Sequence, residues 1–338
     1  MKKTFLIGNK PIGDGSVTVQ SMTNTDTKDV EKTLLQIDKL YEAGADLVRV
    51  SIPDIESARA VKELVARSPV PLIGDIHFSA DPAVIAIENG IKKIRINPSN
   101  LSDEGLKRVV EKCIEYDVPI RVGVNKGSVK RKVTPKELVD LTLKAAKKIE
   151  DLGWDKLVLA VKTSSVKETV ESYRLLAQRT EYPLHVGLTE AGTADFGSVK
   201  SSVAIGALLL DGIGDTIRVS LSGDPVREVY AAKAILRAVG IDKNFVEVIS
   251  CPGCARTEIA VEELAKIVEN ITKDYKKPLK IAVMGCVVNG IGEGKDADFG
   301  VAGGKDRSVL FKKGEVYKTV DNFDIERELK TLCEEYHG

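Results

Sequence analysis

Short runs of apolar and β-branched residues alternate with longer amphipathic stretches between Val17 and Val239. Each short run leads into a polar turn, then into apolar residues at helical spacing, and then to Gly or Pro before the next run. Eight such units are present, and their predicted strands begin at Val17, Asp46, Pro71, Lys93, Pro119, Lys156, Leu184 and Asp215. Because parallel strands must be joined by crossovers, this α/β pattern predicts a closed (β/α)8 barrel of the TIM type.

Local signals mark where the helices of these units begin and end. Thr134, Pro135 and Glu137 form a predicted capping box, and glycines stand where helix C-caps are expected. An open doubly wound sheet is the alternative architecture. No G-x-G-x-x-G motif follows the first predicted strand, so the usual nucleotide signature of that alternative is missing.

The pattern changes after Gly240, where a linker and entry strand are predicted over residues 240–250. We expect a helix over 256–275, a strand over 279–284 and a glycine-rich turn after it. A hairpin near Ser308 to Val320 and a last helix after Asp324 complete the pattern. The prediction is therefore a barrel domain over 1–240 and a smaller α+β domain over 241–338.

Composition excludes several classes of partner. Of 338 residues 43% are hydrophobic, and 50 basic residues balance 50 acidic ones at a pI near 6.9. This balance gives no general reason to expect nucleic acid or an anionic membrane as a partner. The N-terminus carries no signal-peptide pattern and no stretch approaches a membrane span. With few, unpaired cysteines, the composition indicates a reducing cytoplasm.

Cations occur inside the predicted barrel strands, which is an expensive place for a charge that lacks a partner. Few acidic residues lie in the same runs, and residues two apart on a strand share a face. These cations therefore line the end of the barrel where active sites form, and we expect them to bind a phosphate or diphosphate. The candidate substrate-binding residues are Arg49, Arg95, Asn97, Arg121, Asn125, Lys162 and Arg218. The plainer reading is that several arginines sit at strand ends and pair with loop carboxylates.

Three further polar residues are candidates for acid–base chemistry at the same end of the barrel. Asp75 and His77 share a face of one strand, so the carboxylate could fix the histidine's tautomer. Glu190 follows the seventh strand and is the candidate general acid or base. Each could instead be structural, as a hydrogen-bonded core histidine or part of an ion pair.

Four of the five cysteines fall in the C-terminal domain, and three of these lie near one glycine-rich segment. Cys251 and Cys254 form a Cys-Pro-Gly-Cys loop that can aim two thiolates at one metal group, and Cys286 follows the strand over 279–284. Three thiolates fit three corners of a four-iron cluster, and Glu293 is the candidate oxygen ligand. A structural zinc, a redox dithiol and inert buried thiols remain alternatives. Cys113 and Cys333 lie in predicted helices and are read as packing residues.

The chain resembles the bacterial (E)-4-hydroxy-3-methylbut-2-enyl diphosphate synthases of the methylerythritol phosphate route. The resemblance runs nearly end to end. It is carried by VQSMT at 19–23, RVS at 49–51, DIHF at 75–78, RINP at 95–98, RVGVN at 121–125, TEAG at 189–192, SCPGCARTE at 250–258 and MGCVVNGIGE at 284–293.

The resemblance implies an iron–sulfur oxidoreductase that reduces 2-C-methyl-D-erythritol 2,4-cyclodiphosphate by two electrons. It implies a [4Fe-4S] cluster on Cys251, Cys254, Cys286 and Glu293, and a substrate held by the cations and polar residues named above. It also implies reduced flavodoxin or ferredoxin as the electron donor, and a head-to-tail homodimer. Two rivals stay open. One is a barrel aldolase or synthase that acts on a phosphorylated sugar, with Lys162 of a barrel strand forming a Schiff base and a structural zinc in the tail. The other is a non-catalytic iron–sulfur redox sensor.

Overall fold

The computed structural model describes residues 2–77, 79–125 and 133–337. The chain folds as two compact units, Met1–Ile241 and Asp242–Gly338, and each is described by itself. Among the described residues, no helix combines the length and apolar character needed to cross a membrane.

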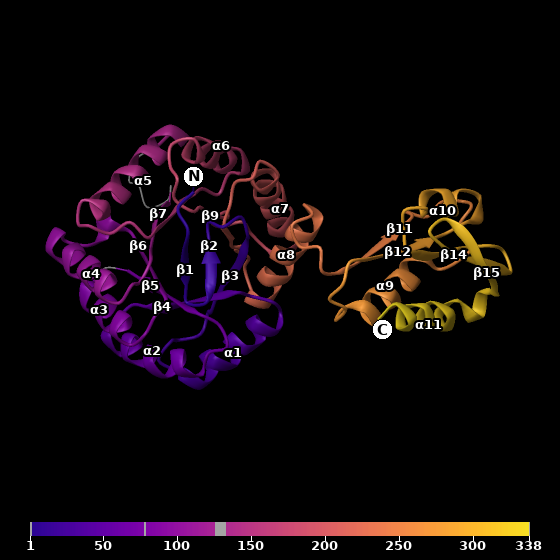
Figure 1. Ribbon diagram of the computed structural model, residues 1–338, viewed down its shortest axis with the longest axis horizontal. Helices are drawn as coiled ribbons and strands as arrows, with labels where there is room; N and C mark the ends of the chain where they lie inside the picture. The colour runs from indigo at the N-terminus through magenta and orange to yellow at the C-terminus, as the bar shows by residue number, and fades with distance from the viewer. Residues whose placement is uncertain (1, 78, 126–132, 338) are drawn as a thin grey trace. The chain divides into compact units, whose positions relative to one another are not determined.

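The first unit is a parallel eight-stranded barrel surrounded by helices (Figure 1), which confirms the predicted fold class. The strands are β3 (Thr18–Met22), β4 (Leu47–Ile52), β5 (Leu72–Ile76), β6 (Lys93–Ile96), β7 (Ile120–Asn125), β8 (Leu157–Lys162), β9 (His185–Val186) and β10 (Thr216–Ile217). They follow the order β8-β7-β6-β5-β4-β3-β10-β9, and a bridge between Leu159 and Leu184 joins the two ends of this series.

One helix follows each strand and covers the outside of the barrel. The helices are α1 (Val30–Glu42), α2 (Ile55–Arg67), α3 (Ala80–Glu88), α4 (Asp103–Glu115), α5 (Pro135–Glu150), α6 (Val166–Ala177), α7 (Ala194–Leu210) and α8 (Pro225–Ala238), with a 3-10 turn at Pro98–Asn100. The capping box of Thr134 and Glu137 is present at the start of α5. Gly44, Gly90 and Gly153 follow helix ends at φ +100°, +95° and +91°, a backbone conformation that favours glycine.

Two of the predicted barrel strands are shorter in the structure than expected. The strands expected from Leu184 and Asp215 shrink to two residues each, β9 and β10. Just beyond β9, a Cβ on Gly187 would lie 2.2 Å from the Arg218 carbonyl oxygen, so the two chains approach too closely for a regular pleat to continue.

An N-terminal hairpin, β1 (Phe5–Ile7) and β2 (Lys10–Ile12), precedes the barrel and was not predicted. Its Ile7 and Ile12 pack with Leu47, Ile73 and Val158, which are buried inside the barrel. The hairpin therefore forms an apolar floor at the amino-terminal end of the strands.

The second unit is a mixed five-stranded sheet in the order β11-β12-β13-β14-β15. Its elements are β11 (Val246–Ser250), α9 (Val261–Thr272), β12 (Leu279–Met284), α10 (Val287–Glu293), β13 (Phe299–Ala302), β14 (Arg307–Lys312), β15 (Glu315–Asp321), a 3-10 turn (Asn322–Asp324) and α11 (Ile325–His337). The predicted hairpin and last helix are present. Alternate residues of β12 face opposite sides, so Ile281 and Val283 pack with α9 and α11 while Ala282 and Met284 face α10.

The segment predicted as a glycine-rich turn is instead the short helix α10, so that prediction was wrong. A Cβ on Gly290 would lie 2.8 Å from the Met284 Cβ and 3.0 Å from the Ala302 Cβ, so the glycine lets α10 lie directly on the sheet. This packing outweighs the low helix propensity of glycine. The helix predicted over 256–275 begins only at Val261, because residues 251–260 form the loop that carries two cysteines.

Candidate functional site

The cations predicted to line the barrel do lie close together inside it. Asp75, Arg95 and Arg121 are register partners on consecutive strands, so they share the inner face. Lys162 ends β8 and Arg218 immediately follows β10. Burial lowers the pKa of Lys162, and the neighbouring arginines lower it further.

Asp75 is the carboxylate shared by two of these arginines. Its Oδ1 accepts a hydrogen bond from Arg95 Nη1 at 3.2 Å, and its Oδ2 lies 3.8 Å from Arg49 Nε. Burial raises the pKa of Asp75, but Arg49, Arg95 and Arg121 outweigh it and lower the pKa below its ordinary value. Arg49 also points two donors at Met22 Sδ, at 3.1 and 2.8 Å, and burial lowers its pKa to about 10.

Arg218 has a carboxylate partner that sequence reasoning missed. Glu228 of α8 is buried and lies 3.3 Å from both Nε and Nη2 of Arg218. The same carboxylate accepts the backbone N–H of Leu221 at 2.9 Å, so it fixes both the arginine and the loop after β10. Arg218 is therefore paired with a carboxylate, although this carboxylate comes from a helix and not from a loop.

Arg121 is a buried cation with donors that are unpartnered among the described residues. It is 3% exposed, and its Nε and Nη1 have no hydrogen-bond partner within the described part of the chain. Burial lowers its pKa, and Arg49 and Arg95 lower it further. A guanidinium nevertheless stays protonated in proteins, so Arg121 is a buried charge with free donors.

Two more basic groups inside the barrel were also missed. Lys93 begins β6, is fully buried and donates to Gln20 Oε1 at 3.2 Å. His185 of β9 is fully buried, and its Nε2 lies 3.2 Å from Lys162 Nζ. Both residues stand at strand starts, so only the alternation of side chains along the strand could have indicated that they point inward.

The remaining barrel candidates occupy the strand ends. His77 follows β5 and is half-buried, with its carbonyl oxygen accepting from Asn100 at 3.2 Å, while Asn97 is buried after β6. Asn125 ends β7, and its side chain lies outside the described part of the structure. Glu190 is exposed and has φ +54°, a left-handed conformation that is uncommon for a non-glycine residue.

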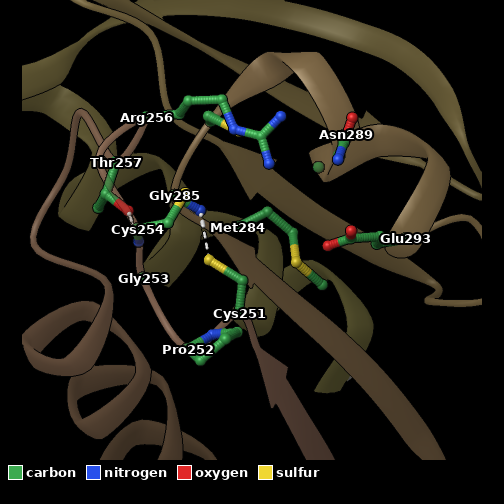
Figure 2. Close-up of a pocket in the computed structure, with 12 residues that line it drawn as sticks. Cys251, Pro252, Gly253, Cys254, Arg256, Thr257, Met284, Gly285, Asn289 and Glu293 are labelled. Atoms are coloured by element: carbon green, nitrogen blue, oxygen red, sulfur yellow. Dashed lines mark hydrogen bonds between the residues drawn. The ribbon is translucent and has the colours of Figure 1, made fainter.

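The second unit brings the predicted cluster ligands to one pocket of about 160 Å³ (Figure 2). Cys251, Cys254, Cys286 and Glu293 all line it. Cys251 and Cys254 come from the loop before α9, Cys286 is the N-cap of α10, and Glu293 is the last residue of that helix. Figure 2 shows the Cys251 thiol and the Glu293 carboxylate pointing into the space beside the Met284 thioether.

Backbone and side-chain donors favour thiolates in this pocket. Cys251 Sγ accepts the Gly285 N–H at 3.1 Å, and Thr257 Oγ1 accepts the Cys254 N–H at 2.8 Å. Hydrogen bonds from the backbone and side chain of Arg256 lower the pKa of the exposed Cys254 thiol. Arg256 and Thr257 belong to the SCPGCARTE motif, but the sequence alone gave no role to either.

Three thiols and a carboxylate around one pocket form a donor set that could hold a metal group. Among residues 2–77, 79–125 and 133–337, no group of three or more His, Cys, Asp or Glu side chains is arranged to hold a metal ion. By contrast, burial raises the pKa of the Cys113 thiol, and raises that of Cys333 to about 11, so both suit packing.

Comparison with known proteins identifies the family. The GcpE TIM-barrel domain matches residues 2–233, and the GcpE protein C-terminal domain matches residues 247–335. The chain belongs to the GcpE family. This confirms the family expected from the sequence.

Curated relatives match along nearly their whole length. The 4-hydroxy-3-methylbut-2-en-1-yl diphosphate synthase (flavodoxin) of Caldanaerobacter subterraneus subsp. tengcongensis is 52% identical over 338 residues, covering 97% of this chain and 95% of that protein. The protein of the same name from Clostridium perfringens is 49% identical over 337 residues and covers 97% of each chain.

Solved structures resemble this GcpE barrel in fold alone. Type I 3-dehydroquinate dehydratase from Clostridium difficile has a TM-score of 0.55 at 14% identity, covering 70% of this chain and 98% of that one. Dihydropteroate synthase from Stenotrophomonas maltophilia has a TM-score of 0.54 at 18% identity, covering 71% and 98%.

Proposed function

We propose that the chain catalyses the reductive ring opening and dehydration of 2-C-methyl-D-erythritol 2,4-cyclodiphosphate to (E)-4-hydroxy-3-methylbut-2-enyl diphosphate. The product is a precursor for isoprenoids. Membership of the GcpE family and full-length relatives named for this product support the reaction. The chain is therefore an enzyme and an oxidoreductase, rather than an aldolase or a redox sensor.

The charge inside the barrel carries the proposal for the substrate class. Six basic side chains lie inside the barrel, and the carboxylates in contact with them in the described structure are Asp75 and Glu228. The basic set is Arg49, Lys93, Arg95, Arg121, Lys162 and Arg218. A diphosphate supplies the missing negative charge and accepts the free donors of Arg121, and planar guanidinium groups grip phosphate through paired hydrogen bonds.

A [4Fe-4S] cluster is the cofactor that we assign to the pocket of the second unit. Cys251, Cys254 and Cys286 would hold three irons, and Glu293 would supply the oxygen ligand of the fourth. Bound there, the cluster supplies electrons and a Lewis-acidic iron for the substrate oxygen that leaves. The polar N–H of Gly285 and the nearby Arg256 stabilise the negative charge of the thiolates.

The chain's own residues bind the substrate and move its protons. Arg121 and Lys162 hold the diphosphate and stabilise the charge that grows on the freed phosphate when the ring opens. Glu190 donates the proton that converts the departing hydroxyl to water, and its left-handed backbone is the kind of strain that clusters at functional positions. Asp75 fixes Arg49 and Arg95, and His77 and Asn97 lie at the same strand ends. Asn125 is a further candidate for binding the substrate.

Reduced flavodoxin is the electron donor that we assign, because the relatives are named for it. Ferredoxin is the alternative. A donor and a cluster of this kind belong in a reducing cytoplasm.

A head-to-tail homodimer completes the proposal. Helix α8 runs back from the strand ends that carry the cations, and only residues 239–245 separate it from β11. These seven residues reach at most ~25 Å when fully extended. Such a short linker favours a cluster domain that serves the barrel of a second subunit.

Anaerobic purification followed by iron and sulfide analysis tests the cofactor, and product analysis with reduced flavodoxin tests the reaction. We expect four irons and four sulfides per chain, and conversion of the cyclic diphosphate to the linear one. Stoichiometric zinc without sulfide would contradict the cofactor. Activity recovered by mixing a Glu190→Gln chain with a Cys254→Ser chain would support the shared site, whereas verified subunit exchange without activity would contradict it.

A further inference from the structure

Lys162 has an unusual environment for a cation that must bind a phosphate. Its side chain is buried, and its Nζ lies 3.2 Å from His185 Nε2, which is fully buried itself. Within the described residues Lys162 makes no ion pair. Gly187 leaves just enough room for this contact, because a Cβ there would lie 3.1 Å from Lys162 Nζ.

The charged groups around Lys162 are mostly of its own sign. Four arginines, on β4, β6 and β7 and after β10, lower its pKa by repulsion after burial has lowered it most. The two carboxylates inside the barrel, Asp75 and Glu228, are already engaged by arginines. The charged groups that act on Lys162 and His185 from the surrounding elements are Arg49, Lys93, Arg95, Arg121 and Arg218, and Tyr173 contacts the His185 backbone. Asp75 and Glu228 contact three of these arginines.

The excess positive charge inside the barrel falls if one of the basic side chains loses a proton. Arginine keeps its proton in proteins, whereas a buried lysine or histidine gives one up readily. His185 is the weaker base of the pair, so it is neutral and offers one ring nitrogen to Lys162. Its position is fixed by its own backbone, because Tyr173 Oη donates to the His185 carbonyl oxygen at 2.5 Å.

We propose that Lys162 is uncharged in the empty barrel, held on the neutral imidazole of His185, and that it takes up one proton when the diphosphate binds. The negative charge of the bound diphosphate stabilises the protonated form of Lys162, so the lysine is charged only when the substrate is present. Lys162 thereby becomes a phosphate-binding cation on arrival of its ligand, and His185 is a positioning residue that holds Nζ in both states. This inference rests on the proposed function, since it needs a diphosphate in the barrel.

Isothermal titration of the cyclic diphosphate into the full cluster-loaded chain, without reductant, tests the proposal. Repeating the titration at pH 7.5 in buffers of different ionisation enthalpy gives the number of protons bound. We expect uptake of about one proton per diphosphate, and a Kd that rises up to about tenfold per pH unit above the pKa of the empty state. Binding with no proton uptake would overturn the inference and leave the proposed function standing.

Three variants assign the proton to a residue. Lys162→Met should bind the diphosphate more weakly and take up no proton. His185→Gln should still take up the proton while Kd rises, because the lysine remains but loses its fixed position. Lys93→Met is the matched control, since it removes another buried lysine of the barrel, and it should leave the uptake unchanged.

The opposite pattern would assign the proton elsewhere. If Lys93→Met abolished the uptake while Lys162→Met kept it, the inference would be wrong. If no variant and no wild-type chain bound the diphosphate, the substrate class proposed for the barrel would fail, and the inference with it.

Discussion

Replacing Arg121 with Met should make the barrel more stable and its diphosphate binding weaker. Two buried N–H groups of Arg121 lack partners in the described structure, and each unsatisfied buried donor costs ~1–3 kcal/mol. Methionine keeps the apolar stem and removes both donors and the charge. At the lower bound for two donors, the free energy of unfolding should rise by about 2 kcal/mol.

The assay uses Trp154, the only tryptophan, which is buried in the barrel unit. Its fluorescence during urea unfolding reports the barrel without a signal from the second unit. A gain of 2 kcal/mol corresponds to a melting temperature higher by ~4–8 °C for a domain of this size. In the same variant, the Kd for the cyclic diphosphate should rise at least tenfold, because a paired hydrogen bond to phosphate is lost.

Arg218→Met is the matched control. It leaves Glu228 buried without its cation, and removing one partner of a buried ion pair costs ~3–5 kcal/mol. The two variants should therefore shift the unfolding midpoint in opposite directions. If Arg121→Met destabilised the barrel as much as Arg218→Met does, Arg121 would be a structural residue and the reasoning from its free donors would be refuted.

Three further outcomes are expected. Cys254→Ser should abolish iron incorporation while Cys113→Ser keeps it, and equal iron loss in both variants would contradict the ligand assignment. Glu190→Gly should relieve the left-handed backbone and raise the free energy of unfolding by roughly 1 kcal/mol while turnover is lost; retained turnover would remove Glu190 from the mechanism. Burial, with repulsion by Arg121 and Arg49, holds the pKa of His185 below its unfolded value, so the stability that His185 contributes, full above about pH 6.5, should fall as the pH drops, by up to ~1.4 kcal/mol per unit. Trp154-monitored unfolding of His185→Gln should lack this dependence, and an unchanged pH profile would show that another group titrates.

The barrel was predictable because its signals are local. The alternation of side chains along a strand and the capping residues of a helix are both patterns within a few positions of the sequence. Thr134 and Glu137 could therefore be identified from their spacing alone. The same alternation placed Arg95 and Arg121 on the inner face. What spacing cannot give is the partner from another element: Glu228 reads as an ordinary helix residue until α8 packs behind Arg218.

In the segment that carries the cluster cysteines, the candidate residues were recognised but the backbone was not. Its cysteines were found from their identity and clustering, yet the backbone that carries them was misread, since Gly290, Gly292 and Gly294 indicate a turn when considered locally. The contact of Gly290 with Met284 and Ala302 exists only in the folded sheet, and it is this contact that makes the segment helical. The roles of the cysteines and of Glu293 remain predictions until iron is measured.

The hairpin floor has a kinetic consequence. Ile7 and Ile12 cover the amino-terminal end of the barrel with fully buried apolar side chains, so we expect ligands to enter from the carboxyl ends of the strands. Substrate and product must then use the same route in succession, and the linear diphosphate has to leave before the next cyclic one can enter. Added product should compete directly with substrate for entry. A substitution that loosens the packing of Ile7 and Ile12 should weaken that competition, because ligands could then also pass through the amino-terminal end of the barrel.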